Sequence, residues 1–106
     1  MINGVSARPL RTIPDPRGSI RHMLRRDWPE FNEIGEVYFS YVESGAIKAW
    51  RKHTRMVMQL AVPVGAVTVV LYDARPTSST YKELTEYHVG TDDHAKYILL
   101  TVPPGI

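Results

Sequence analysis

The sequence predicts an all-β protein, an antiparallel β-sandwich or barrel built from short strands. Three observations indicate this class: runs rich in β-branched and aromatic residues, near-regular spacing of those runs, and punctuation by glycine, proline, serine and aspartate. The eight prolines also argue against a helical protein. With 106 residues, of which 43% are hydrophobic and 23% charged, the chain is expected to form one globular domain over residues 1–106, with residues 1–15 as an N-terminal arm.

The N-terminal third is predicted to contain an edge strand, a turn and a second short strand. Prolines within the arm favour an edge position, because proline cannot donate to a strand ladder. Asp15-Pro16-Arg17-Gly18 predicts a turn, since proline presets φ and glycine accepts positive φ. A strand is expected over residues 19–24. Residues 25–36 are the one helical candidate, and Pro29 limits that helix to a turn or two.

From residue 36 onward the pattern is strongly β. Each run contains valine, isoleucine, threonine or aromatic residues and ends at glycine, proline or a polar loop. The predicted strands cover residues 36–42, 46–53, 57–62, 66–73, 84–89 and 96–102. The last strand leads into Pro103-Pro104-Gly105, a turn that normally continues into another strand. We therefore expect a sandwich that lacks its C-terminal part, or one whose open edge is covered by a partner chain.

Composition excludes several function classes. The net charge is only +2 and the basic residues are spread along the chain, which argues against a nucleic-acid binder. Without cysteine there can be no disulfide, zinc–thiolate site or thiol nucleophile. The four histidines form no His-x-His or His-x-x-x-His pair, so we expect no metal and no cofactor. No signal peptide is visible and the apolar runs are too short to cross a bilayer, so we expect a cytoplasmic protein that does not bind membranes.

Four segments, in order along the chain, match the motifs of one enzyme family. Asp15-Pro16-Arg17-Gly18 is similar to its Asp-x-Arg-Gly turn, and Gly45-Ala46-Ile47-Lys48, after Ser40, to its Gly-Val-x-Arg strand. Residues 65–80 are similar to its Gly-x-Val-x-x-Val-x-x-Asp-x-Arg run and the Ser-x-Thr that follows. Residues 98–105 are similar to the strand and turn before its His-Gly-Phe motif. The chain thus resembles the dTDP-4-dehydrorhamnose 3,5-epimerases over residues 15–105, which implies a cupin-type jelly roll.

The resemblance also implies a catalytic base near the second of these segments. In the family, a histidine three residues after the strand arginine removes a proton beside the keto group. Here Lys48 takes the arginine slot and Arg51 the histidine slot, and arginine cannot lose its proton at a useful pH. His53 is the candidate base, because it lies two residues on and so on the same face of a regular strand. It matches the second member of a His-x-His pair in a related branch, while the family's lysine falls at Met58.

Binding a nucleotide sugar requires cations for the diphosphate and an aromatic surface for the base. Arg17, Lys48 and Arg51 are the candidate substrate-binding cations. Trp50 could stack on the ligand or simply fill the core. The candidate phenolic proton donors are Tyr38, Tyr41 and Tyr72.

Several of these residues have a plain structural alternative. His53 could be a partly exposed strand residue among solvated neighbours, and Arg17 could pair with Asp15 in its own turn. Asp73 and Arg75 are expected to form a structural ion pair at a strand end, rather than a substrate site.

Two functions follow from the resemblance. A homodimer is expected under either. The first is a metal-free nucleotide-sugar 3,5-epimerase, an isomerase of polysaccharide biosynthesis that acts on a 4-keto-6-deoxyhexose nucleotide. The second is a non-catalytic member of the same fold, which binds a sugar nucleotide or serves as an assembly subunit. The four-segment match favours the first, and Arg51 in the base slot, together with the missing downstream acid of the family, favours the second.

Overall fold

The computed structural model describes all residues from 1 to 106, and its regular elements are seven β-strands. They are β1 (Ser6–Pro9), β2 (Thr12–Asp15), β3 (Gly18–Arg21), β4 (Met58–Leu60), β5 (Ala66–Tyr72), β6 (Leu84–Gly90) and β7 (Ile98–Val102). No helix is present, and so none that could cross a lipid bilayer. The all-β prediction is confirmed.

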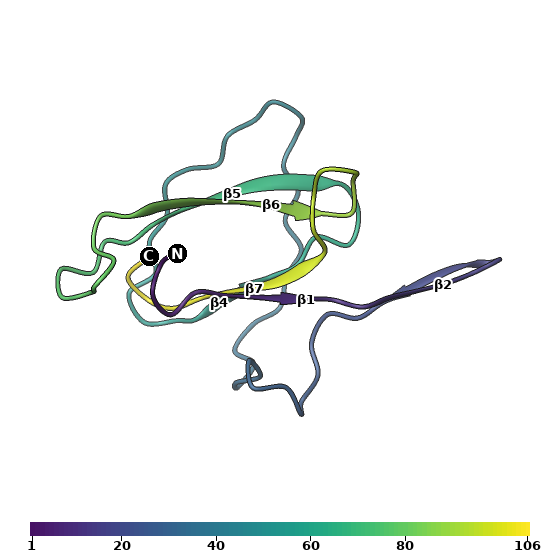
Figure 1. Ribbon diagram of the computed structural model, residues 1–106, viewed down its shortest axis with the longest axis horizontal. Coiled ribbons are helices and arrows are strands. Elements are labelled where there is room, and N and C mark those ends of the chain that lie inside the picture. The colour runs from purple at the N-terminus through teal and green to yellow at the C-terminus, as the bar shows by residue number, and fades with distance from the viewer.

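The strands form two layers that face each other across the core (Figure 1). One layer is a three-stranded antiparallel sheet in the order β1-β7-β4, and the other is the β5–β6 hairpin. In β5, the inward positions Val67, Val69 and Leu71 alternate with Ala66, Thr68, Val70 and Tyr72, which lie outside the core cluster, as the two-residue period of a strand requires. The sandwich prediction is confirmed.

The core is small and continuous between the layers. Seven buried apolar side chains form one cluster: Ile2, Val5, Leu71, Val89, Ile98, Leu100 and Val102. Each such side chain contributes about 1.5–3 kcal/mol by leaving water. The cluster joins the N-terminal turn to both layers, so the first residues of the chain belong to the core rather than to a free arm.

Strand β7 is buried on both faces. Its inward face supplies Leu100 to the core, while Leu99 on the opposite face is also fully buried. Beside Leu99 in the ladder lies Arg8, which stacks on the Trp28 ring at 4.6 Å and pairs with Glu30. The irregular segment that carries Trp28 and Glu30 is therefore pinned to the outer side of the three-stranded sheet.

Strands β2 and β3 form a hairpin that projects from the body of the molecule (Figure 1). Its turn is the predicted one, with Asp15 opposite Gly18 and the Asp15 carboxylate accepting a hydrogen bond from the Arg17 N–H at 2.7 Å. No other strand pairs with this hairpin. It lengthens the molecule to 50 Å and raises the radius of gyration to 14.6 Å, above the roughly 13 Å of a compact chain of this length.

Three predicted elements are wrong. Residues 36–42 and 46–53 are not strands, and residues 25–36 contain turns near Asp27 to Glu30 but no helix. The stretch between β3 and β4 instead runs as an open loop (Figure 1). Its residues have the composition of strands, but a strand is stable only when a neighbour accepts its ladder hydrogen bonds, and no strand of the chain pairs with this stretch.

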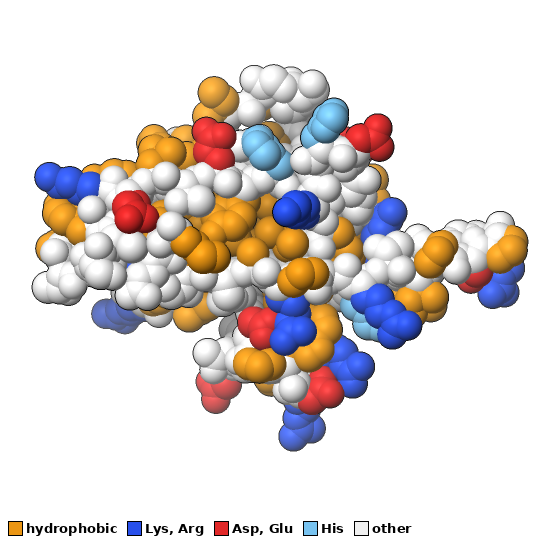
Figure 2. Space-filling view, viewed as in Figure 1, with side chains coloured by type: hydrophobic (Ala, Val, Ile, Leu, Met, Phe, Trp, Pro, Cys, Tyr) orange, Lys and Arg blue, Asp and Glu red, His pale blue; other side chains and the backbone are white.

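This loop leaves much apolar surface open to solvent. The chain exposes 8198 Å², whereas a compact monomer of 12.0 kDa exposes about 6,000 Å². Figure 2 shows hydrophobic side chains spread over the visible face. Exposed large apolar residues of the loop are Met23, Ile34, Val37, Tyr38, Phe39, Tyr41, Val42, Ile47, Trp50, Met56 and Val57. Monomeric soluble proteins rarely expose a contiguous apolar patch of more than a few hundred Å².

Candidate functional site

The candidate base and three of the candidate binding residues lie on the open loop. Lys48 is exposed, and its ammonium donates to the Ser40 hydroxyl at 3.1 Å and to the Tyr41 carbonyl. Both acceptors come from the same loop, across the turn in which the Ala46 N–H donates to the Glu43 carbonyl at 2.9 Å. Lys48 is thus oriented locally, with its charge available to an anion.

His53 is the most shielded of these residues. It is half-buried, whereas Arg51 is exposed and the Trp50 ring is 68% exposed. Because Trp50 is open to solvent, the core-filling alternative for this side chain is wrong. The His53 carbonyl accepts a hydrogen bond from the Gly105 N–H at 2.8 Å, which ties this point of the loop to the C-terminal turn.

Arg17 lies apart from the others, at the tip of the β2–β3 hairpin. Its guanidinium is 3.5 Å from the Asp15 carboxylate, and its side chain is 90% exposed. The pairing with Asp15 that the sequence left open is therefore present. It is a surface contact that contributes at most about 1 kcal/mol, so it leaves the cation free to bind a stronger anion.

Two open depressions lie on the outer side of the three-stranded sheet, away from the candidate residues. One, of about 330 Å³, is lined by Ser6, Ala7, Arg8, Pro9 and Glu30. The other, of about 420 Å³, is lined by Gly4, Ser6, Pro29, Glu30, Asn32, Val57, Thr101 and Pro103. None of His53, Arg17, Lys48, Trp50 and Arg51 lines either depression. The charges there are already matched, since the Arg8 hydrogen bonds lower the pKa of Glu30.

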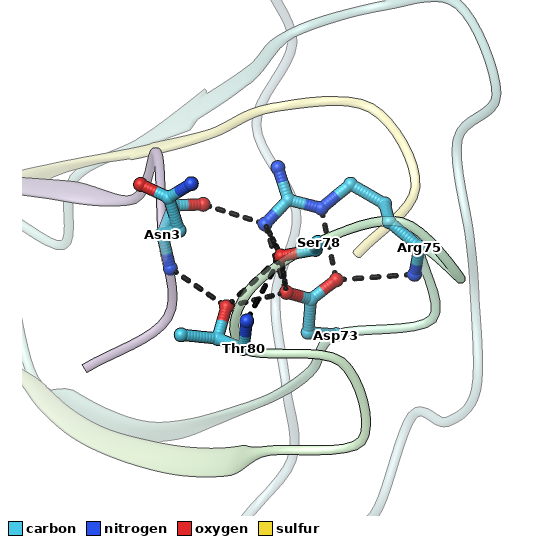
Figure 3. Close-up of polar contacts among 5 residues, drawn as sticks. All are labelled: Asn3, Asp73, Arg75, Ser78 and Thr80. Carbon is cyan, nitrogen blue, oxygen red and sulfur yellow. Dashed lines mark hydrogen bonds and ion pairs between the residues drawn. The ribbon is translucent and has the colours of Figure 1, made fainter.

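The most highly organised polar group in the molecule is centred on Asp73 (Figure 3). This carboxylate directly follows β5 and is fully buried. One oxygen accepts from the Arg75 Nε at 2.8 Å and the Arg75 backbone N–H at 3.1 Å. The other accepts from Arg75 Nη2 at 2.9 Å, the Ser78 hydroxyl at 2.7 Å and the Thr80 hydroxyl at 2.6 Å. The predicted Asp73–Arg75 ion pair is confirmed.

The same group binds the N-terminal turn. Arg75 Nη2 donates to the Asn3 carbonyl at 2.6 Å, and the Asn3 N–H donates to the Thr80 hydroxyl at 3.0 Å (Figure 3). The two bonds hold one residue of the N-terminal turn from both sides. We call the five residues Asn3, Asp73, Arg75, Ser78 and Thr80 the Asp73 cluster.

Hydrogen bonding makes Asp73 a permanent anion. The guanidinium of Arg75, followed by the Thr80 and Ser78 hydroxyls, holds the pKa of this carboxyl far below its usual range, although burial alone would raise it. With every oxygen already saturated, Asp73 cannot act as a general base. Its role is structural.

No group of three or more histidine, aspartate or glutamate side chains is placed to hold a metal ion. His88 pairs with the Thr68 hydroxyl at 3.1 Å across the outer face of β5–β6, and His22 lies at the base of the projecting hairpin, where its carbonyl accepts from the Tyr97 hydroxyl at 2.6 Å. Neither histidine forms a hydrogen bond with His53.

The known proteins that this chain resembles are all named for sugar isomerisation or for polysaccharide or glycan biosynthesis. The chain is 33% identical to the spore coat polysaccharide biosynthesis protein SpsL of Bacillus subtilis over 106 residues, which is 100% of the chain and 68% of that protein. Its fold matches the crystal structure of a dTDP sugar isomerase from Desulfovibrio desulfuricans with a TM-score of 0.91 and 44% identity, over 97% of the chain and 64% of that structure. The chain belongs to the dTDP-sugar epimerase-like family.

A further member of this epimerase-like family is similar over a shorter stretch. The probable low-salt glycan biosynthesis epimerase Agl13 of Haloferax volcanii is 33% identical over 91 residues, covering 84% of the chain and 58% of that protein. The chain therefore spans little more than half the length of this relative. No protein-family model matches the chain.

Sequence reasoning missed two parts of this epimerase-like chain. The sequence places Asn3 in an N-terminal arm and Gly105 in a turn, yet each contacts Arg75, and Gly105 also contacts His53. The sequence signals a turn at Pro103-Pro104-Gly105, but no local pattern reports which distant residue that turn touches.

We predict that Asp73→Asn lowers the free energy of unfolding by about 3 kcal/mol at pH 7, because the change leaves Arg75 partly buried without its anion. In the folded state the carboxyl pKa lies below its unfolded value near 3.9, so its stabilisation is complete above that pH and is lost as the pH falls. The difference in the free energy of unfolding between the wild type and Asp73→Asn should therefore become smaller as the pH falls. Urea denaturation from pH 7 to pH 2 measures it.

The exposed Asp93 offers a matched control for that experiment. Asp93→Asn removes the same charge without breaking a buried pair, and should change stability by no more than about 0.5 kcal/mol. The structural role of the Asp73 cluster would be contradicted if the two variants lost equal free energy of unfolding. It would also be contradicted if the loss caused by Asp73→Asn stayed constant down to pH 2.

Proposed function

We propose that this protein is a nucleotide-sugar 3,5-epimerase acting on a 4-keto-6-deoxyhexose nucleotide of the dTDP-4-dehydrorhamnose type. The observation that carries the proposal is the match of nearly the whole chain to a dTDP sugar isomerase at 44% identity. The names of the two curated relatives, both concerned with glycan or polysaccharide biosynthesis, support the same class of substrate.

The reaction is an exchange of a proton on the carbons beside a ketone. A base removes the C–H proton, the electron pair passes into an enolate, and an acid returns a proton to the opposite face of the ring. We assign the base to His53, the one histidine among residues 33–57, the part of the loop that carries the other candidates. Lys48 or Arg51, the basic side chains nearest to His53 along the loop among the candidates, would stabilise the negative charge on the enolate oxygen.

Substrate binding falls to the remaining candidates. We assign the diphosphate to Arg17, whose surface pairing with Asp15 is easily exchanged for a phosphate, together with Lys48 or Arg51. Trp50, with its ring open to solvent, would stack on the nucleotide base or the sugar.

The direct test is incubation of the protein with a dTDP-4-keto-6-deoxyhexose in deuterated water. Deuterium should enter at the ring carbons beside the ketone, and His53→Ala should slow that entry by about 10²- to 10⁴-fold, the usual contribution of a general base. His88→Ala, which alters a histidine outside the site, serves as the control and should leave the rate unchanged. Mass spectrometry or NMR follows the label.

A second function is favoured by two observations. Arg51 occupies the slot of the family's base, and the candidate residues lie on an open loop rather than in an enclosed cleft. Both suit a protein that binds a sugar nucleotide without transforming it. Calorimetric binding of the nucleotide sugar with no deuterium entry at any pH from 5 to 9 would establish this function and overturn the epimerase assignment.

We also propose that the protein acts as a cytoplasmic homodimer. The projecting β2–β3 hairpin has no partner strand, and the surface exceeds that of a compact monomer by roughly the area that a subunit contributes to an obligate dimer. A second copy bound to the hairpin would place charged side chains of the partner subunit close to Arg17.

Sedimentation equilibrium over a hundredfold range of concentration tests the dimer. Twice the 12.0 kDa chain mass is expected throughout the micromolar range. Ile20→Lys, which puts a charge on the 59% exposed side chain of the hairpin, should shift the protein toward monomer. The exposed Val64→Lys, outside the hairpin, is the control. A monomer at every concentration would refute the dimer.

A further inference from the structure

One backbone hydrogen bond holds the part of the loop that carries the candidate site. Among residues 47–57, the only backbone group with a backbone partner is the His53 carbonyl, which accepts from the Gly105 N–H at 2.8 Å. The side-chain bonds of Lys48 stay within the loop itself. The position of the His53 main chain relative to the two layers therefore depends on where Gly105 lies.

Gly105 is in turn fixed by the residues that follow β5. Its carbonyl accepts from the Ala74 N–H at 3.1 Å. Its α-carbon lies against the aliphatic stem of Arg75, so closely that a Cβ at this position would be 2.5 Å from Arg75 Cγ. The backbone φ of +90° also requires glycine. Only glycine meets both conditions, and its close contact with the Arg75 stem fixes the position of the turn.

Arg75 itself has little freedom. Its guanidinium is held through two nitrogens: Nε and Nη2 both donate to the Asp73 carboxylate, and Nη2 also donates to the Asn3 carbonyl and lies 3.3 Å from the Ser78 hydroxyl. A side chain held at its tip by these contacts presents its stem as a rigid surface. Gly105 rests on that surface.

We infer that Arg75 is a positioning residue for His53, acting through its contact with Gly105 and the hydrogen bond from Gly105 to the His53 carbonyl. Asp73 supports it by fixing the guanidinium. The effect of this arrangement on catalysis rests on the proposed function. The structural coupling of Arg75 to His53 holds whether or not the protein is an epimerase.

The test uses the ¹⁵N-labelled chain and two substitutions. Arg75→Lys keeps an aliphatic stem but loses the fork, and should speed hydrogen exchange of the Gly105 amide at least tenfold and shift the His53 ring resonances. Gly105→Ala should shift the same ring resonances, since its Cβ must displace the turn. The control is Gly65→Ala, where φ is +82° and a Cβ meets open space, so it carries the same backbone strain without the contact.

With the keto-sugar substrate, Arg75→Lys and Gly105→Ala should lower kcat for deuterium entry about tenfold and change KM less than twofold, because they displace the base rather than the binding cations. Gly65→Ala should leave kcat within twofold of wild type.

Unchanged Gly105 exchange and unchanged His53 resonances in Arg75→Lys would overturn the inference, even if Gly105→Ala fails to fold. If both NMR signals respond but the wild-type protein shows no deuterium entry, the link stands and the epimerase assignment fails. If the signals respond and kcat does not, the mechanical link stands, but Arg75 has no positioning role in catalysis and that part of the inference is wrong.

Discussion

The buried carboxylate of Asp73 is the constraint on which the rest of the structure depends. An isolated buried charge is costly, so the fold must supply donors, and it draws them from Arg75, Ser78 and Thr80. Those donors then bind the N-terminal turn through Asn3 and support the C-terminal turn at Gly105. Both ends of a chain with a small core are thereby fixed to the end of β5.

The candidate site lies on the part of the molecule that this anchor holds least. Residues 33–57 carry the candidate base and most of the candidate cations, but no strand pairing. Their apolar side chains are exposed, which a second copy or a further chain segment would relieve. Catalytic groups are commonly carried by loops that a rigid scaffold positions. Here the scaffold is the two-layer sandwich. It is connected to this part of the loop by the backbone hydrogen bond from Gly105 to the His53 carbonyl.

The parts of the structure that the sequence predicts are those set by local chemistry. The turn at Asp15, the alternating strand at Val67 to Leu71 and the Asp73–Arg75 pair each depend on residues a few positions apart. Residues 36–42 have the composition of a strand and form none, because pairing depends on a neighbour that composition cannot supply. The link from Gly105 to His53 joins residues distant in sequence and could not be predicted for the same reason.

A double-mutant cycle between Asp73 and Arg75 tests this account most directly. Urea denaturation of the wild type, Asp73→Asn, Arg75→Gln and the double variant gives the interaction free energy of the pair. If the buried pair anchors both chain ends, the two losses should be strongly non-additive, with an interaction of about 2 kcal/mol or more. Losses that add to within about 0.5 kcal/mol would show that the two side chains act independently, and would contradict the central claim.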